Sequence, residues 1–189
     1  LVLDVRSQFE YEKGHIPNSI NIGLNGNLAP LAGLLITNIN QPILLLCPLN
    51  SEKETIIRLA RVGFDNVTGY LKGGFETWFK SGQLCDQICS ISTLEFFKNK
   101  TKQEVKIFDV RNQNEYNLEH VKEAINIPLD IIKNHINDFP KYDIFYIYCA
   151  AGYRSIIASS ILKRNGIHNF INIKGGLKSI KKFNSLINN

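Results

Sequence analysis

The chain has 189 residues, of which 44% are hydrophobic and 21% charged, and its formal net charge is +5. This composition is ordinary for a globular protein, and no apolar stretch approaches the length of a membrane-spanning helix. The lysines are scattered, apart from Lys178, Lys181 and Lys182, and aromatic residues do not alternate with them. The positive charge therefore predicts neither a nucleic-acid surface nor a membrane partner.

The four cysteines, Cys47, Cys85, Cys89 and Cys149, do not combine with the four histidines at metal-ligand spacings. We therefore predict no metal site in this chain. Few cysteines and many lysines favour a reducing cytoplasm. The sequence starts on a strand-like segment at Leu1 and contains no methionine, so we expect it to be a piece of a longer protein, with its first domain truncated at the N-terminus.

One pattern occurs twice along the chain. The first copy reads Leu3-Asp4-Val5-Arg6, Glu10-Tyr11 and Gly14-His15-Ile16-Pro17, and the second reads Phe108-Asp109-Val110-Arg111, Glu115-Tyr116 and Glu119-His120-Val121. Matched positions are offset by 105 (109 − 4), and a later pair, Gly73-Gly74 and Gly175-Gly176, by 102 (175 − 73). The pattern predicts two domains of ordinary size, residues 1–84 and 91–189, joined by a linker at 85–90.

Each copy alternates apolar, β-branched segments with segments of helical periodicity. In the first copy we predict a central strand at 43–46 and its helix at 52–62. In the second we predict strands at 105–110, 124–127, 144–148 and 170–173, and helices at 113–118, 129–137 and 155–163. This alternation predicts an α/β fold, with each domain built on a mainly parallel sheet covered by helices on both faces.

The segment Cys149-Ala150-Ala151-Gly152-Tyr153-Arg154-Ser155 links the predicted strand at 144–148 to the helix after it. Open α/β sheets bind ligands at this edge, and a helix start favours an anion or a thiolate. Small side chains leave the turn open, and a guanidinium is able to bind a sulfonate or carboxylate in bidentate fashion. We predict Cys149 as a nucleophile. The predicted substrate-binding residues are Ala150, Ala151, Gly152, Tyr153, Arg154 and Ser155.

The ordered motifs Asp-Val-Arg, Glu-Tyr, Gly-His-Ile-Pro, Cys-x-x-Gly-x-Arg and Gly-Gly resemble those of the rhodanese (sulfurtransferase) family. The resemblance covers nearly the whole chain as two rhodanese-like domains. The first copy is similar to rhodanese-like repeats that follow a metallo-β-lactamase-fold domain in bacterial fusion proteins of the persulfide dioxygenase type. That likeness implies an upstream domain as partner, which would hold an iron site, and no cofactor in this chain. Glu119 departs from the family's usual glycine, which Gly14 keeps.

The resemblance implies a sulfurtransferase in which Cys149 takes sulfane sulfur from an anionic donor, thiosulfate or a persulfide, and passes it to a thiol. A cysteine phosphatase or arsenate reductase is a weaker alternative, because such enzymes place five residues between cysteine and arginine, whereas four lie between Cys149 and Arg154. A non-catalytic binding or regulatory module is the alternative from another class. The physiological donor, the acceptor and a homo-oligomeric state stay open.

The first copy has a cysteine near the equivalent place, Cys47. Counting back from Gly63 against Gly166 (offset 103) aligns Leu46 with Cys149, so Cys47 is predicted to lie one position away. Pro48 has no N–H, and Glu52 and Glu54 bring negative charge. We therefore expect the first domain to be non-catalytic.

The charged residues of the repeated motif are predicted to support the fold. Asp109 and Arg111, like Asp4 and Arg6, end strands and are expected to form ion pairs with Glu115 or Glu10. Asp109 also lies near the catalytic edge by topology. His15 and His120 are predicted to be structural rather than catalytic bases.

Overall fold

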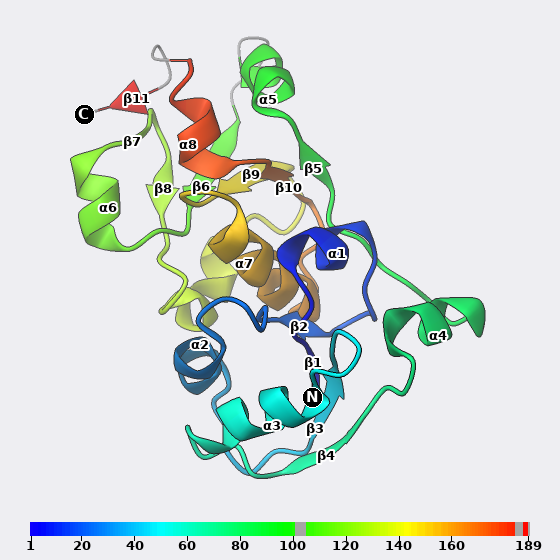
Figure 1. The fold of residues 1–189 in the computed structure, drawn as a ribbon. Helices are drawn as coiled ribbons and strands as arrows, with labels where there is room; N and C mark the ends of the chain where they lie inside the picture. The colour runs from blue at the N-terminus through cyan, green and yellow to red at the C-terminus, as the bar shows by residue number, and fades with distance from the viewer. Residues whose placement is uncertain (101–104, 184–186, 189) are drawn as a thin grey trace. The chain divides into compact units, whose positions relative to one another are not determined.

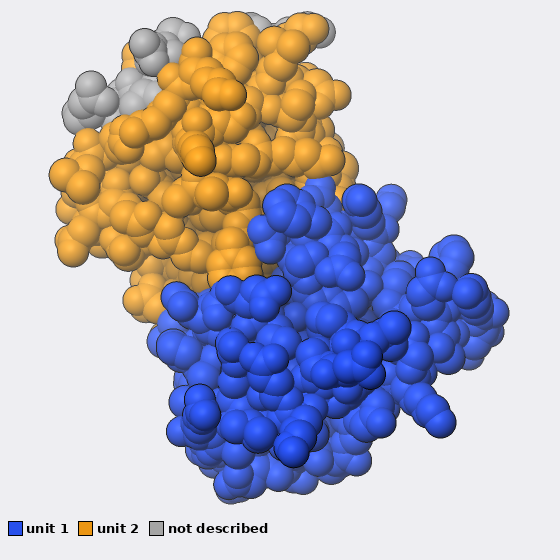
Figure 2. All heavy atoms as spheres, viewed as in Figure 1, with its two compact units in different colours: residues 1–87 blue, residues 88–189 orange. Residues whose placement is uncertain are grey.

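The computed structural model describes residues 1–100, 105–183 and 187–188. The chain divides into two compact units, residues 1–87 and 88–189 (Figure 2), and their boundary falls inside the predicted linker at 85–90. Residues 101–104, 184–186 and 189, which belong to the predicted second domain, lie outside the described residues.

The first unit is built on a four-stranded sheet whose strands are all parallel, in the order β2-β1-β3-β4 (Figure 1). The first strand lies at the centre beside β3, and most of the side chains of these two short segments are buried. The strands are β1 (Val2–Asp4), β2 (Ile20–Asn21), β3 (Ile43–Leu46) and β4 (Val67–Tyr70), and the helices are α1 (Gln8–Lys13), α2 (Leu28–Leu35), α3 (Glu52–Ala60) and α4 (Gly74–Lys80).

The second unit repeats this plan with one more strand, in the order β5-β10-β9-β6-β8, again all parallel. A separate antiparallel pair joins β7 to β11. The strands are β5 (Ser90–Ile91), β6 (Lys106–Asp109), β7 (His120–Val121), β8 (Ile125–Asn126), β9 (Phe145–Tyr148), β10 (Phe170–Ile173) and β11 (Ile187–Asn188). The helices are α5 (Thr93–Lys100), α6 (Gln113–Leu118), α7 (Tyr153–Arg164) and α8 (Gly176–Ile180), with a 3-10 helix, η1 (Ile132–Asp138).

The predicted α/β fold with two parallel sheets is confirmed. The predictions for β3, α6 and β10 match to the residue. The predicted α-helix at 129–137 is wrong, because the structure has a 3-10 helix there, broken at His135 (φ −115°, ψ 17°). This segment is rich in isoleucine and asparagine, which are weak helix formers, so apolar spacing alone did not make an α-helix.

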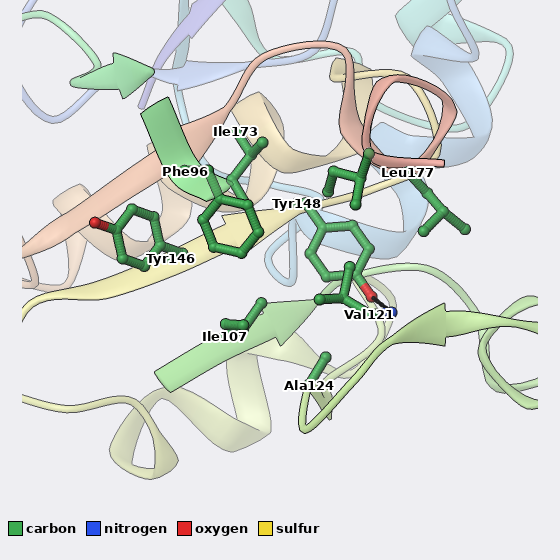
Figure 3. Close-up of a cluster of buried hydrophobic side chains, with 9 residues drawn as sticks. Phe96, Ile107, Val121, Ala124, Tyr146, Tyr148, Ile173 and Leu177 are labelled. Carbon is green, nitrogen blue, oxygen red and sulfur yellow. Dashed lines mark hydrogen bonds between the residues drawn. The ribbon is translucent and has the colours of Figure 1, made fainter. Parts of the chain in front are cut away.

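Strand β9 is apolar throughout because both of its faces are covered. On one face Tyr146 and Tyr148 join a cluster with Phe96 of α5 and Leu177 of α8 (Figure 3). On the other face Phe145 contacts the aromatic rings of Phe108 and Phe139. In Figure 1, α5 and α8 lie on one side of this sheet and α7 on the opposite side. The result is a rigid central strand whose carboxyl end carries Cys149.

Candidate active site

Cys149 follows directly after β9, the central strand of the second sheet. The Val110 N–H donates to the Tyr148 carbonyl oxygen at 3.0 Å, and Asp109 pairs in register with Tyr148. The carboxyl ends of β6 and β9 therefore meet at one edge, which is where parallel α/β sheets bind ligands. The structure places Cys149 at the strand-to-helix turn that the sequence predicts.

The sulfur of Cys149 lies inside its own turn. The Gly152 N–H donates to Cys149 Sγ at 3.1 Å, and the cysteine is only 1% exposed. Gly152 adopts φ +104°, which a side chain would oppose. Helix α7 starts at the next residue, so its positive end and the Gly152 amide both favour a negative charge on sulfur. The turn is built to hold a thiolate or a sulfur anion.

Backbone hydrogen bonds from α8 hold the Cys149 turn in place. The Leu177 N–H donates to the Cys149 carbonyl oxygen at 2.8 Å, and the Lys178 N–H donates to the Ala150 carbonyl oxygen at 3.0 Å. A Cβ atom on Gly176 would overlap the Cys149 carbonyl oxygen. The second Gly-Gly motif therefore lets the backbone of α8 approach the Cys149 turn closely.

Asp109 and Arg111 lie at the end of β6, beside the Cys149 turn, and form an ion pair with each other. The Arg111 guanidinium donates to both Asp109 carboxylate oxygens, at 2.6 to 3.0 Å, and to the Glu119 carbonyl oxygen at 2.7 Å. Asp109 is fully buried. The prediction that Glu115 is the ion-pair partner of this motif is wrong. Asp109 and Arg111 are two residues apart along the chain and form an ion pair with each other.

The first unit repeats this arrangement. The Arg6 guanidinium donates to both carboxylate oxygens of Asp4, whereas Glu10 accepts hydrogen bonds from Ser7 at the start of α1. Glu10 is therefore not the partner of Asp4 or Arg6 either.

The positive charge of Arg154 is paired with a carboxylate. Its two terminal nitrogens donate to the two oxygens of Glu115, at 2.5 and 2.7 Å. Glu115 is held in place because it also closes the capping box of α6 with Asn112. The hydrogen bonds to Glu115 raise the pKa of Arg154 above its usual value, and those from Arg154 lower the pKa of Glu115. The pair joins α6 to the start of α7, next to the Cys149 turn.

This pair gives a testable pH dependence. The lowered pKa of Glu115 means that its ion pair stabilises the fold above the ordinary carboxyl range and that this contribution is lost as pH falls through the lowered pKa. We expect Glu115→Gln to lower the free energy of unfolding at neutral pH, and the difference from wild type to shrink with acidification. Urea denaturation across this range measures it. A difference that stays constant with pH would contradict the assignment.

The other residues predicted to bind substrate do not all face one space. Ala150 and Tyr153 are half-buried, and Ala151 is exposed. Ser155 is fully buried, and its hydroxyl donates to the Gly152 carbonyl oxygen at 3.2 Å. Ser155 therefore braces the start of α7 rather than lining an opening.

A cavity of about 300 Å³ opens beside the Cys149 turn. It lies between α6 and α8, next to Ala150. Its lining combines five charged residues, Arg111, Glu115, Glu119, Lys178 and Lys181, with Leu118, Ala150 and Leu177. Of these lining residues the sequence prediction had placed only Ala150 and Arg111 at the site, and it missed the two lysines and the other four. The available signal was the position of Lys178 and Lys181 directly after the second Gly-Gly motif.

Cys47 is the equivalent of Cys149 by strand register, which corrects the alignment that opposed Leu46 to Cys149. Leu46 pairs with Asp4 as Tyr148 pairs with Asp109, so the offset at the cysteine is 102 (149 − 47). The offset is 103 at the glycine that follows the helix (166 − 63), so the first unit has one residue fewer than the second between the cysteine and that glycine. Counting back from the glycine therefore displaced the match by one position.

The turn that follows Cys47 differs from the Cys149 turn, although Asn50, which replaces Gly152, also has a positive φ of 64°. Pro48 has no N–H to donate, and the Cys47 sulfur approaches the Thr55 hydroxyl at 3.7 Å. Burial, together with the nearby Glu52 and Asp4 carboxylates, raises the pKa of Cys47 to about 11. A cavity of about 370 Å³ lies at this turn too. Cys47 occupies the position equivalent to Cys149, and its raised pKa favours the neutral thiol at neutral pH.

Glu119 takes the backbone conformation of the glycine that it replaces. Gly14 (φ 179°, ψ 131°) and Glu119 (φ −167°, ψ 143°) are both extended, so this turn does not require glycine. In the first unit a Cβ on Gly14 would come within 3.1 Å of the Phe75 ring. The second unit has the smaller Leu177 at that position, which leaves room for Glu119, and Glu119 pairs with Lys181 at 2.5 Å.

The two motif histidines are held in the same way. Nδ1 of His15 lies 2.9 Å from the Tyr11 carbonyl oxygen, and Nδ1 of His120 lies 2.9 Å from that of Tyr116. Each imidazole also stacks on the tyrosine ring four residues earlier, with centroids 3.9 Å apart. These contacts give each histidine a structural role at the helix end.

Among the residues that the structure describes, no group of three or more His, Cys, Asp or Glu side chains is arranged to hold a metal ion. None of the helices in that part of the chain combines the length and the apolar character needed to cross a membrane.

Comparisons with known proteins assign both halves of the chain to one family. A family model described as the rhodanese-like domain matches residues 1–81 and again 93–183. The thiosulfate sulfurtransferase PspE of Escherichia coli (strain K12) is 42% identical over 74 residues, covering 38% of this chain and 70% of that protein. The putative sulfur carrier protein YrkF of Bacillus subtilis (strain 168) is 33% identical over 88 residues, covering 46% of this chain and 48% of that protein.

Among solved structures, a rhodanese-like domain protein from Staphylococcus aureus is 38% identical and aligns over 49% of this chain and 91% of its own, with a TM-score of 0.46. The chain spans about half, or less, of the length of the first curated relatives that it matches, the B. subtilis protein and an adenylyltransferase from Pyropia yezoensis.

Proposed function

This chain belongs to the rhodanese-like domain family, which it represents twice, and on that premise we propose that it moves sulfane sulfur through a persulfide on Cys149. The observation that carries the proposal is the hydrogen bond from the Gly152 N–H to Cys149 Sγ at the start of α7. This contact stabilises negative charge on the sulfur that attacks the donor and on the same sulfur when it leaves.

Two displacements at sulfur complete the proposed reaction. With thiosulfate as donor, the Cys149 thiolate attacks the outer sulfur, an S–S bond forms to Cys149, and the S–S bond of thiosulfate breaks as sulfite leaves with the electron pair. An acceptor thiolate then attacks the outer sulfur of the Cys149 persulfide, and the Cys149 thiolate leaves. No net oxidant is needed, because each S–S bond formed replaces one broken.

The first unit serves this proposal as a non-catalytic partner. Its neutral Cys47 thiol, with Pro48 in the adjoining turn, favours a binding or regulatory role for that unit. The proposal extends by resemblance alone to an upstream metallo-β-lactamase-fold domain that would carry an iron site and exchange sulfur with Cys149. It places the reaction in the cytoplasm, where a reducing medium keeps thiols free.

Mass spectrometry of the full chain tests the function. After incubation with thiosulfate, or with a low-molecular-weight persulfide, we expect the peptide that contains Cys149 to gain one sulfur atom. Cyanide should then remove that sulfur as thiocyanate. A protein that gains no sulfur from either donor and releases no thiocyanate would contradict sulfur transfer and support a binding module in both units.

A further inference from the structure

The cavity beside the Cys149 turn contains charges that are almost all compensated. Arg111 is paired with the buried Asp109, and Lys181 is paired with Glu119 at 2.5 Å. Glu115 is taken by Arg154, which is not itself part of the cavity lining. Each of these three cations already has a carboxylate partner, so a small anion would have to compete with that carboxylate for it.

Lys178 differs from the other cations of the cavity. Its side chain is exposed and lines the cavity, and it forms no ion pair with any of the described residues. Its backbone is tied to the catalytic turn, because its N–H donates to the Ala150 carbonyl oxygen at 3.0 Å. The backbone of this lysine is thus tied to the residue that follows Cys149, on a short helix packed onto that turn (Figure 1).

The first unit supplies an internal comparison. The residue equivalent to Lys178 is Glu76 (offset 102, as for the cysteines), and it lines the cavity at Cys47. Glu76 pairs with Lys80 on its own helix at 2.7 Å. The unit whose cysteine is a neutral thiol thus carries a negative charge at this position, and the unit with the thiolate turn carries a positive one.

We propose that Lys178 binds the anionic end, a sulfonate or carboxylate, of a small sulfane-sulfur donor while the donor's outer sulfur meets Cys149. This inference rests on the proposed function and names a binding residue for it. The ammonium group replaces water around the donor's charged end. Because the lysine side chain is flexible, it is able to contact the charged end of donors of different length. Arg154 then acts by holding α6 against the turn, and Lys178 selects the donor.

Steady-state kinetics test this assignment. We expect Lys178→Glu to raise the KM for thiosulfate roughly tenfold or more, the size of effect expected when a charge-assisted contact is lost, with kcat changed less. Lys178→Arg should restore the KM. Lys141→Glu, an exposed lysine outside the cavity, makes the same change of net charge and should leave the KM near wild type. The KM for a neutral acceptor such as dithiothreitol should not move in any variant.

A second measurement does not depend on sulfur transfer. Iodoacetate and iodoacetamide have similar size but only the first is an anion, and the alkylation rate of the Cys149 peptide gives their ratio. We expect this ratio to fall several-fold in Lys178→Glu and to be unchanged in Lys141→Glu. If both the KM and the ratio equal those of wild type, the role of Lys178 is overturned while sulfur transfer stands. If no persulfide forms in wild type, the ratio still decides whether Lys178 attracts anions to Cys149.

Discussion

Replacing Cys149 by serine is expected to abolish persulfide formation and to lower sulfur transfer by roughly a thousandfold or more, as loss of an enzyme's nucleophile does. The substitution exchanges one atom in a buried position, so the fold and the hydrogen bond from the Gly152 amide should persist. A serine hydroxyl at neutral pH does not form the anion that attacks sulfane sulfur. Thiocyanate release from thiosulfate and cyanide, and the mass of the intact protein, measure both effects.

The matched control is Cys47→Ser in the first unit. With its pKa raised to about 11, only on the order of one Cys47 thiol in ten thousand is ionised at neutral pH. We therefore expect this variant to keep wild-type activity and to keep the added sulfur on the Cys149 peptide. Loss of transfer in Cys47→Ser, or a persulfide on Cys47 that forms as fast as that on Cys149, would refute the assignment of one catalytic unit.

Replacing Gly176 by alanine is expected to destabilise the second unit by about 3 kcal/mol or more and to inactivate the enzyme. The new Cβ would overlap the Cys149 carbonyl oxygen and lie 2.9 Å from two carbonyl carbons of the same turn, and φ is +54°. Backbone atoms of a hydrogen-bonded turn do not relieve an overlap by rotating away, as a flexible side chain does. The overlap would push α8 away from the catalytic turn and break the hydrogen bonds from Leu177 and Lys178.

Gly74→Ala is the matched control in the first unit. Gly74 occupies the equivalent position with φ +66°, but a Cβ there would meet the Cys47 carbonyl oxygen at an ordinary 3.7 Å. This variant should therefore show only the backbone strain, about 1 kcal/mol, and should keep activity. Hydrogen exchange resolves the two units, and Trp78, the single tryptophan, reports on the first by fluorescence. Equal losses of stability in both variants would contradict the overlap argument.

The sequence predicted the fold because the information that defines it is local. The apolar strands, the capping residues of α6 and the glycines at helix ends act over a few residues, so β3, α6 and β10 were placed correctly. The duplication fixed the number of domains. The 3-10 helix η1 was missed because helical spacing of apolar residues does not measure helix propensity.

The alignment of the two cysteines required the strand register, which counting residues along the chain does not provide. A residue gained or lost inside a loop shifts every later match, and only the hydrogen-bonded register of β1 with β3 and of β6 with β9 identified Cys47 as the counterpart of Cys149. Likewise Glu119 departs from the family's usual glycine, but the backbone there is extended, and the size of residue 177 decides whether a side chain fits.

By itself the sequence determined that this protein repeats an α/β unit and that one of its cysteines follows a strand and begins a helix beside a glycine and an arginine. Only the tertiary structure decided which charges cancel. Arg154 and Glu115 lie 39 residues apart yet form a bidentate pair, while Lys178 reaches the same cavity unpaired among the described residues. Ion pairing depends on distances across the fold, and side-chain spacing along a chain does not contain them.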